Sequence, residues 1–366
     1  MPPMSMSWWW AGAIGAARKR HDGGGGEQQP PFRSVALVVG STGIVGTSLV
    51  DILPLPDTPG GPWKVYALSR RPPPPWSPPP PAAVTHLCVD LADAAAVAEA
   101  LAPLTDITHT GSKHYIGPPE SIGKLPVETP FSEDMPRHDY PNFYYDQEDV
   151  LFDAVTSSSS SSSSRRAAAV TWSVHRPSLI FGFSPRSAMN VVCSLCVYAA
   201  ICRKERRELR WPGSLGAWEG FSNASDADLV AEQQIWAAVA DAAAKNEAFN
   251  CSNGDIYKWK QLWPVLAGKF GVEWAGYEGE ERRVGLTAAM AGKEAVWAEI
   301  VAEEKLVATE LGEVANWWFV DALFMDKWEF VDTMNKSKEH GFLGFRNTLR
   351  SFEAWIDKMK LYRIVP

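Results

Sequence analysis

Cysteine is scarce in this sequence. The 366 residues contain five cysteines, an odd and scattered number that does not form the disulfide framework of a small secreted protein. Cys193 and Cys196 form a CxxC pair, but no second pair or nearby histidine completes a metal site. Both stand in an apolar run, which favours buried helix residues. We therefore expect no metal and a reducing compartment.

Long hydrophobic runs and excess positive charge are also missing. The longest apolar stretch, 191–202, is well short of the roughly 20 residues that a membrane span needs. The N-terminal tryptophans precede basic residues 18–20, whereas a secretory signal places its charge first. Lys and Arg number 35 against 43 Asp and Glu, a net charge of −8 that argues against a nucleic-acid binder. We expect a cytoplasmic protein without membrane or nucleic-acid partners.

Low-complexity segments divide the chain. Residues 1–33, which contain glycine and proline clusters and lack apolar periodicity, are predicted to form a flexible tail. Residues 34–185 are predicted to form a first domain with two low-complexity loops, 72–83 and 156–166, which are rich in proline and in serine. Residues 186–366 are predicted to form a smaller, mostly helical lobe whose strands return to that domain.

Strands and helices alternate at the start of the first domain. The apolar run 35–39 is typical of a buried parallel strand, and a helix follows that extends through Ile52. Further strands are predicted at 63–68 and 84–89, with an alanine-rich helix at 91–101. This order predicts an α/β fold with a Rossmann-type doubly wound parallel sheet.

A doubly wound sheet then needs a fourth strand, and the sequence does not supply a complete one. Residues 106–109 begin to look like that strand but stop at Thr110-Gly111, and the next convincing strand is 170–174. The strand–helix alternation of a doubly wound sheet is therefore incomplete after the third strand. Beyond it, 227–244 is predicted to be helical and 248–251 to be a short strand.

A glycine-rich turn joins the first strand to its helix. Gly40, Gly43 and Gly46 form a GxxGxxG pattern in the context that a dinucleotide site requires. Gly40 permits a tight turn, Gly43 lets the backbone approach a pyrophosphate, and Gly46 lets the helix pack close to the strand. The amide groups that open the helix would then bind the phosphates.

The end of the second strand discriminates between dinucleotides. An NAD site usually has an acidic residue there, but this chain has Ser69, Arg70 and Arg71. Two guanidinium groups would pair with a 2′-phosphate, so we predict NADP(H) as the cofactor; exposed loop charges are the weaker alternative. Asp90 closes the third strand and is a candidate either for an adenine contact or for a helix N-cap.

Candidate catalytic residues come from two separate motifs. Short-chain dehydrogenases usually carry Tyr-x-x-x-Lys on one helix face, but Tyr144 has Glu148 at that position and Tyr145 has Asp149. A tyrosine that donates a proton or stabilises an oxyanion needs a nearby cation, because its unperturbed pKa is about 10. Lys113 is the candidate cation, and ordinary core and surface roles for this lysine and Tyr144 are the alternative.

At these motifs the chain resembles the plant progesterone 5β-reductases and iridoid synthases, atypical short-chain reductases that are grouped as enone reductases. The resemblance covers most of the chain. The stretches that carry it include 35–46, Lys113-His-Tyr-Ile-Gly-Pro118, Asn142-Phe-Tyr-Tyr145, Trp172-Ser-Val-His-Arg-Pro177, Phe181-Gly-Phe-Ser-Pro185, Asn250–Asp255, Met334–Lys338 and Gly341–Arg346.

The resemblance implies an activity and a catalytic pair. The implied reaction is 1,4-reduction of the activated C=C bond of a steroid-type or monoterpenoid-type enone or enal, with hydride from NADPH. Tyr144 would stabilise the developing enolate oxygen, and Lys113 would tune Tyr144 electrostatically. Residues 34–185 are then an NADP-binding Rossmann domain, and 186–366 a substrate lobe.

The resemblance also implies contacts with cofactor and substrate. The residues expected at the cofactor phosphates are Thr42, Gly43 and Ile44, and those expected at the nicotinamide are Ser187, Ala188 and Met189. The residues expected at the substrate pocket are Met189 and Phe319, together with Ile116, where relatives often carry another side chain.

Relatives have roughly 40–50 additional residues, about a strand–helix–strand unit, where this chain passes from His109 to Gly111. The resemblance therefore implies that the sheet lacks a central strand–helix–strand unit and has unpaired strand edges. Three hypotheses follow: an active enone reductase, a catalytically inactive NADP(H)-binding protein, or a non-functional truncated isoform. The substrate is a small molecule that the sequence does not name. The oligomeric state stays open, with a homodimer as one hypothesis.

Overall fold

The computed structural model places most of the chain outside the N-terminal tail. The described residues are 32–74, 77, 79–90, 92–93, 113–118, 121, 124–125, 128–160, 171–184, 189–240, 244–325 and 329–366. Apart from residues 92 and 93, which are not helical, the predicted helix at 91–101 lies outside the described residues, as do the partial strand at 106–109 and the tail residues 1–31.

The first domain begins with a three-stranded parallel sheet. Its strands are β1 (Ser34–Val39), β2 (Trp63–Ser69) and β3 (Val84–Cys88), in the order β1-β2-β3. Helix α2 (Ile44–Ile52) connects β1 to β2. The three predicted strands are confirmed, with ends that differ by at most one residue. Because the strands are parallel, their carboxyl ends lie at one edge of the sheet, where a Rossmann fold binds its ligand.

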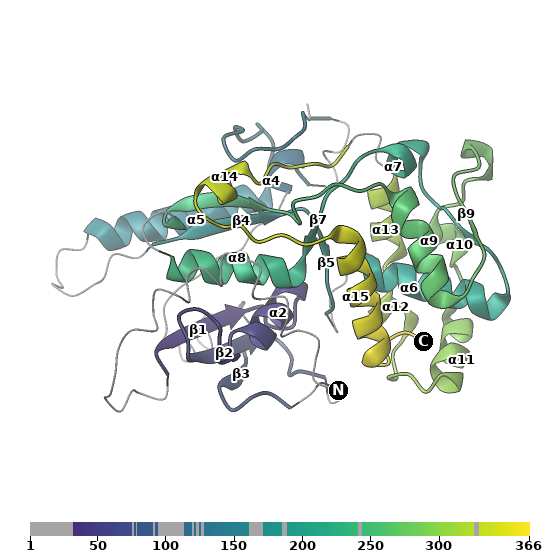
Figure 1. The fold of residues 1–366 in the computed structure, drawn as a ribbon, viewed down its shortest axis with the longest axis horizontal. Coiled ribbons are helices and arrows are strands. Elements are labelled where there is room, and N and C mark those ends of the chain that lie inside the picture. Colours follow the sequence, from purple (N-terminus) through teal and green to yellow (C-terminus); the bar gives the residue numbers. More distant parts are fainter. Residues whose placement is uncertain are drawn as a thin grey trace.

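The strands that follow pair separately from this sheet in the described part of the chain (Figure 1). Strand β4 (Ser173–Pro177) pairs with β8 (Glu247–Cys251), and β5 (Leu179–Phe181) pairs with β7 (Ala224–Asp226). All these pairs are parallel, and among the described strands β1 pairs only with β2. The α/β Rossmann-type fold is thus confirmed, and the described sheet lacks its central unit.

One predicted strand boundary was wrong. The strand expected at 170–174 begins at Ser173 and extends to Pro177. Its register with β8 pairs Ser173 with Glu247 and Pro177 with Cys251, so the partner strand and not the local apolar pattern sets its ends. The strand expected at 248–251 is confirmed and begins one residue earlier.

Helix α8 (Ala227–Val239) covers one face of the first sheet. Its residues Ala231 and Ile235 pack in one apolar cluster with Ala36 and Val38 of β1. On the opposite face of β1, Val35 and Val39 are 57% and 45% exposed. Among the described residues, β1 is therefore covered on one face only.

The helix predicted over 227–244 ends early, at Val239. Ala240 adopts an extended backbone conformation with ψ of 155°. Its amide still donates to the carbonyl of Trp236, but the extended backbone cannot continue the helix.

Helix α5 (Phe143–Ser160) is longer than expected and follows the short helix α4 (Lys113–Ile116). We expected a loop over 156–166, but α5 continues through Ser160, and 161–170 lie outside the described residues. Serine has moderate helix propensity, so a helix that is already nucleated extends into a serine run at low cost. The Thr156 hydroxyl also donates to the carbonyl of Phe152 within the helix.

The C-terminal lobe is built around helix α6 (Val191–Glu205). Every residue from Val191 to Cys202 is buried, which confirms Cys193 and Cys196 as buried helix residues. Burial raises the pKa of the Cys193 thiol to about 12. The helices that pack directly on α6 are α9 (Trp259–Phe270), α11 (Glu294–Glu303), α12 (Leu311–Val314), α13 (Trp317–Phe324) and α15 (Thr348–Leu361).

Shorter elements complete this lobe. They are β6 (Leu209–Arg210) paired with β9 (Trp274–Ala275), α7 (Leu215–Glu219), the 3-10 helix η5 (Glu280–Arg282), α10 (Leu286–Ala289) and α14 (Asn335–Glu339). In the described part of the chain, the longest apolar helices are too short or too polar to cross a lipid bilayer.

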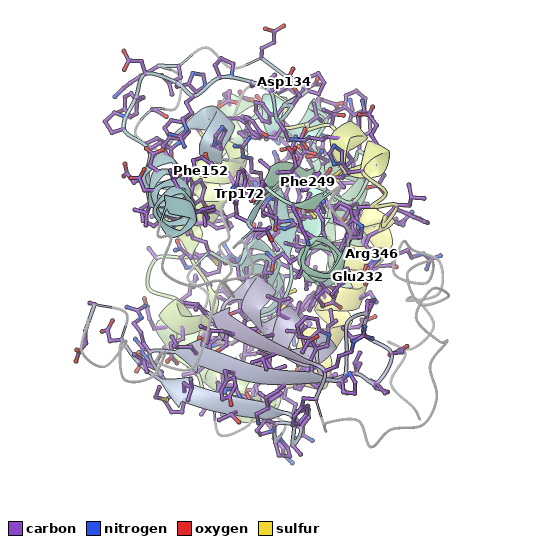
Figure 2. The ribbon with its side chains drawn as sticks, turned by 90° about the vertical axis from the view of Figure 1, so that its left-hand side faces the viewer. Asp134, Phe152, Trp172, Glu232, Phe249 and Arg346 are labelled. Carbon is purple, nitrogen blue, oxygen red and sulfur yellow. The ribbon has the colours of Figure 1, made fainter. Side chains whose placement is uncertain are left out.

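Buried hydrogen bonds and an ion pair connect the C-terminal segment to α8. Asp226 caps α8, and its carboxylate also accepts hydrogen bonds from Ser351 and Trp355 of α15, at 2.5 and 2.9 Å. One turn and a half further along α8, Glu232 pairs with Arg346, as Figure 2 shows. Because lone buried charges are strongly unfavourable, these pairs fix where the chain passes before α15.

His175, at the centre of β4, is a buried titratable group that should make the stability of the fold depend on pH. It is fully buried, its Nδ1 lies 2.7 Å from Oε1 of Gln233 in α8, and burial lowers its pKa to about 4. The unfolded chain therefore binds a proton that the folded chain does not, so stability falls as the pH falls from about 6.5 towards 4.

We expect this residue to contribute a slope of about 1.4 kcal/mol per pH unit to the free energy of unfolding. His175→Gln should lose that slope between pH 6.5 and 5. Urea unfolding of the parent and the variant at several pH values measures the difference. Equal slopes for the two proteins would contradict the assignment.

Candidate functional site

The glycine-rich turn after β1 has a geometry that only glycine permits at two positions. Gly40 has a φ of +75°, in the left-handed region. A Cβ atom on Gly46 would stand 2.2 Å from the carbonyl oxygen of Gly40, far inside van der Waals contact. At Gly43 the same oxygen would lie 3.1 Å from a Cβ, which leaves little room. The turn and the first residues of α2 are therefore as close as backbones can pack.

Polar groups of this turn remain available to a ligand. No side chain caps α2, whose N-cap is Gly43. The hydroxyl of Ser41 is buried and has no hydrogen-bond partner among the described residues. Uncapped amides at a helix start and a buried orphan hydroxyl fit a phosphate group, which accepts several hydrogen bonds and carries negative charge.

The segment after β5 is held against the same turn. Ser184 donates a hydrogen bond to the carbonyl of Thr42 at 2.5 Å. A Cβ on Gly182 would lie 2.3 Å from Cγ2 of Ile44, so this backbone touches the first residue of α2. The chain continues from here into 185–188, so Ser187 and Ala188 lie outside the described residues.

The end of β2 presents two exposed arginines beside the turn. The buried Ser69 hydroxyl donates to the carbonyl of Arg71 at 2.6 Å and so fixes the backbone that carries Arg70 and Arg71. No described carboxylate pairs with either arginine. Both guanidinium groups can therefore pair with an anion at this edge of the sheet.

Asp90 follows β3 and is exposed. One of its carboxylate oxygens accepts the amide of Ala92 at 3.1 Å, so this side chain caps the turn after the strand. An adenine contact and a helix N-cap were the two roles considered for Asp90. The structure contains a capping hydrogen bond, and most of the helix expected to follow lies outside the described residues.

Helix α4, which begins at Lys113, is held by side chains from outside it. The carbonyl of His114 accepts a hydrogen bond from the Tyr145 hydroxyl at 2.7 Å, and that of Ile116 accepts from Ser121 at 2.9 Å. The carbonyl of Tyr115 lies 2.7 Å from Nε2 of His138. A helix of one turn leaves its carbonyls unsatisfied, so these contacts fix its position.

A buried carboxylate lies between α4, α5 and β4. Glu148 of α5 is 2% exposed, and its oxygens lie 3.1 Å from Nη2 of Arg176 and 3.0 Å from Nη2 of Arg137. Nδ1 of His114 is 3.2 Å from Oε1, at ion-pair distance but not aligned as a hydrogen bond. Burial alone would raise the pKa of Glu148, but the His114 contact and the arginine charges outweigh it and lower the pKa to about 2.

The network continues from Arg176 into the second sheet. Nη1 of Arg176 donates to the Tyr115 hydroxyl at 3.2 Å, and that hydroxyl donates to Oδ1 of Asn250 in β8 at 2.6 Å. Burial also lowers the pKa of His114. Two helices and two strands therefore meet at one ionised carboxylate.

Tyr144 lies in the first turn of α5, next to Tyr145. It is half-buried, and its amide donates to Oδ1 of Asn142 at 3.0 Å. Burial raises the pKa of its phenol, so the hydroxyl stays protonated at neutral pH and is able to donate a proton or a hydrogen bond. Tyr145 binds α4 directly, so the structure brings the backbone of the Lys113 helix next to the helix of Tyr144.

The predicted substrate residues lie on separate elements. Met189 is 47% exposed and precedes Asn190, the N-cap of α6. Phe319 is half-buried in α13, which packs on α6, and Ile116 is half-buried at the end of α4. The described residues include no measured contact among these three.

Sequence reasoning missed the roles of Glu148 and Arg176. Glu148 was noticed only as the residue that replaces the expected lysine. The signal for Arg176 was available, because a charged residue within the buried strand sequence 173–177 must have a partner of opposite charge. Identifying that partner required the tertiary structure.

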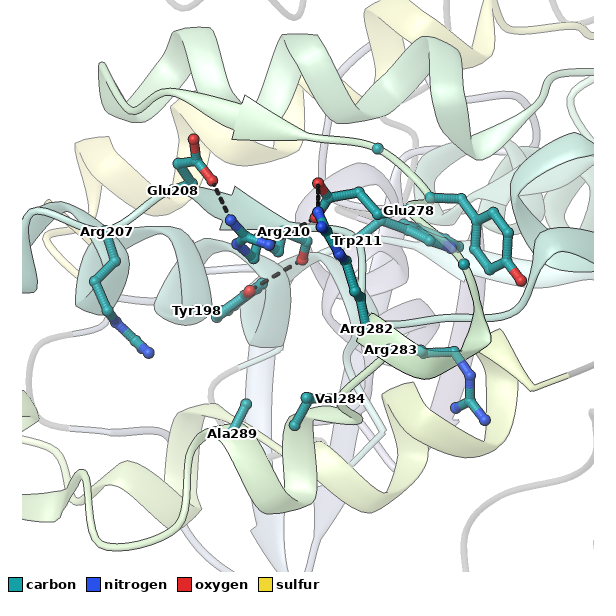
Figure 3. Close-up of a pocket in the computed structure, with 13 residues that line it drawn as sticks. Tyr198, Arg207, Glu208, Arg210, Trp211, Glu278, Arg282, Arg283, Val284 and Ala289 are labelled. Atoms are coloured by element: carbon teal, nitrogen blue, oxygen red, sulfur yellow. Dashed lines mark hydrogen bonds and ion pairs between the residues drawn. The ribbon is translucent and has the colours of Figure 1, made fainter.

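A separate pocket of about 440 Å³ lies in the C-terminal lobe (Figure 3). Tyr198, Arg210 and Trp211 contribute to its lining. Arg210 pairs with Glu208 and Glu278 at 2.8 and 2.6 Å, so its charge is compensated. None of the predicted catalytic or cofactor residues lines this pocket, so we do not assign it to the candidate site described above.

Comparison with solved structures supports the fold. An epimerase from Methanothermobacter thermautotrophicus aligns over 96% of this chain and 97% of its own, with a TM-score of 0.57 and 13% identity. The RMD protein of Pseudomonas aeruginosa, solved in complex with NADPH, aligns over 91% and 99%, with a TM-score of 0.51 and 15% identity.

Similarity to curated proteins is much higher. A 3-oxo-Δ(4,5)-steroid 5β-reductase of Arabidopsis thaliana is 49% identical over 92% of this chain and 94% of its own. An (S)-8-oxocitronellyl enol synthase of Nepeta cataria has the same identity and coverage. The family model described as a PRISE-like Rossmann-fold domain matches residues 79–366. This chain, with its Rossmann turn and its Lys113 and Tyr144 motifs, belongs to the family of PRISE-like Rossmann-fold proteins.

Proposed function

We propose that this protein is an NADPH-dependent reductase of the activated C=C bond of enones or enals. The observation that carries the proposal is the docking of the Lys113 helix on the Tyr144 helix, in a family whose similar members include a steroid 5β-reductase and an enol synthase. Substrates of steroid or monoterpenoid type are consistent with the names of these relatives. The compartment we expect is the cytoplasm.

NADPH is the proposed cofactor because the turn after β1 and the end of β2 fit its two phosphate-bearing parts. Gly43 and Ser41 stand where a pyrophosphate would meet the start of α2. Arg70 and Arg71 would bind a 2′-phosphate, which an acidic residue at this position would repel. When bound, NADPH supplies the hydride for the reduction.

In the proposed reaction Tyr144 interacts with the carbonyl oxygen of the substrate. Hydride addition at the β-carbon moves the electrons of the C=C bond towards the carbonyl, so negative charge develops on the carbonyl oxygen. The protonated phenol of Tyr144 would donate a hydrogen bond to that oxygen and stabilise the enolate. The ammonium group of Lys113 would favour the same charge electrostatically.

A second candidate is an NADP(H)-binding protein without turnover. It is favoured by the separate pairing of β1–β3 and of β4–β8 among the described strands, and by the exposed side chains Val35 and Val39 on β1. A missing central unit would remove part of the crevice wall while leaving the phosphate turn in place.

Substitution at Gly46 tests the phosphate turn. In Gly46→Ala the new methyl group would force Gly40 or α2 to move, so we expect NADPH affinity to fall by at least about tenfold, or 1.4 kcal/mol. Gly268→Ala is the matched control, because a Cβ there meets nothing within 4 Å. Fluorescence titration with NADPH measures both. Unchanged affinity in Gly46→Ala would contradict this site.

Removal of the paired arginines tests cofactor choice. We expect Arg70→Ala combined with Arg71→Ala to weaken NADPH binding by about 10- to 100-fold, since charge-assisted contacts contribute about 1.5–3 kcal/mol. NADH binding should change little, because NADH lacks the 2′-phosphate. Titration of both cofactors gives the ratio. Equal losses for NADPH and NADH would refute the assignment.

Tyr144→Phe tests the catalytic proposal. With 2-cyclohexen-1-one as the substrate, we expect kcat to fall by about 10²- to 10³-fold, which is the range for loss of one oxyanion donor, with NADPH affinity unchanged. Tyr140→Phe, at a half-buried tyrosine that precedes α5, is the control. A parent protein that binds NADPH but does not turn over any small enone would favour the second candidate instead.

A further inference from the structure

We propose that Glu148 is a positioning residue, which holds α4, and with it Lys113, against the helix that carries Tyr144. This inference rests on the proposed function, because it takes Lys113 and Tyr144 as the catalytic pair. Glu148 is not expected to touch substrate or cofactor. Its effect on the reaction would pass through the placement of α4.

The first argument is where Glu148 stands. It follows Tyr144 by four residues in α5, so the two side chains leave the same face of the helix, one turn apart. In the common Tyr-x-x-x-Lys arrangement this position carries the cation. Here it carries a carboxylate that reaches His114, the residue next to Lys113. In this chain the candidate lysine, Lys113, lies on the separate helix α4, and Glu148 contacts that helix through His114.

The second argument is that α4 cannot hold itself. It is a single turn of four residues, far below the length at which a helix is stable alone. Tyr145 anchors its backbone through the carbonyl of His114, at 2.7 Å. Glu148 adds the charge that keeps Arg176 against Tyr115 of the same short helix, since Nη2 of Arg176 is 3.1 Å from Glu148 and Nη1 is 3.2 Å from the Tyr115 hydroxyl.

The third argument is the balance of charge. Arg137 also pairs with the exposed Asp149 at 2.6 Å, so it keeps a partner when Glu148 is neutralised. Arg176 is 6% exposed, and Glu148 is its one ion-pair partner among the described residues. Neutralising Glu148 therefore leaves a buried guanidinium without a counter-charge directly beneath α4, which favours displacement of that helix.

The variant Glu148→Gln tests this directly, because it removes the charge and keeps the shape. The matched control is Asp149→Asn, which removes the neighbouring carboxylate that binds the same Arg137 but is exposed. With 2-cyclohexen-1-one and NADPH, we expect kcat to fall at least tenfold in Glu148→Gln. The dissociation constant for NADPH and the KM for the enone should stay within threefold. Asp149→Asn should match the parent.

Hydrogen–deuterium exchange of the peptide 113–118 gives a readout that does not need turnover. We expect faster exchange in Glu148→Gln than in the parent and in Asp149→Asn, with unchanged exchange in the turn 40–46. Tyr145→Phe, which removes the hydroxyl bound to α4 without changing any charge, should also speed exchange of this peptide. If Glu148→Gln does not fold, this second variant still tests whether side chains of α5 hold α4 in place.

Each outcome separates the two proposals. A parent that binds NADPH without turnover refutes the proposed function, and exchange of 113–118 then decides the role of Glu148 alone. Unchanged exchange in both variants overturns the positioning role, and so does a kcat of Glu148→Gln within twofold of the parent. Parallel losses of kcat and NADPH binding would show a general structural role and would also overturn it.

Discussion

The ionised carboxylate of Glu148 is the contact on which the geometry of the candidate site depends. A carboxylate that is 2% exposed is tolerated only where cations surround it, and here Arg176 and Arg137 come from two different parts of the chain. Because those arginines also contact α4 and the region before α5, one buried charge fixes several segments at once. Its lowered pKa is the electrostatic sign of that arrangement.

At the proposed cofactor site, close backbone packing in the turn 40–46 fixes the geometry. The carbonyl of Gly40 stands so close to α2 that position 46 has room only for a hydrogen atom. The Ser184 contact to Thr42 then brings the segment after β5 to the same turn. The two ends of the site are therefore built differently: the turn by sterically enforced glycines, and the α4–α5 pair by buried charge and hydrogen bonds.

The first sheet and the C-terminal lobe differ in how completely their apolar side chains are covered. Helix α8 covers one face of β1, while the apolar side chains Val35 and Val39 of the other face remain exposed. The lobe around α6 packs fully, and Asp226 and Arg346 tie its last segment to α8. The fold therefore keeps the turn and the α4–α5 pair even where the described sheet has no central strand.

The sequence by itself determined the first three strands, the glycine turn and the buried apolar helix at 191–202, because apolar periodicity and glycine geometry are local properties of the chain. It also predicted Lys113 and Tyr144 as the candidate catalytic residues, through short motifs. It did not determine the end of α5 in the serine run, nor the bounds of β4, since a packed helix and a partner strand set these.

Only the tertiary structure decided what Glu148 does. In the sequence Glu148 is only the residue that replaces an expected lysine, and Arg176 lies two residues beyond the strand predicted at 170–174. The pairing joins residues that are 28 positions apart, and no local pattern encodes which buried cation meets which buried anion. That choice depends on how α4, α5 and β4 pack together, which is why the partner of a buried charge is the part of a site that a single sequence leaves open.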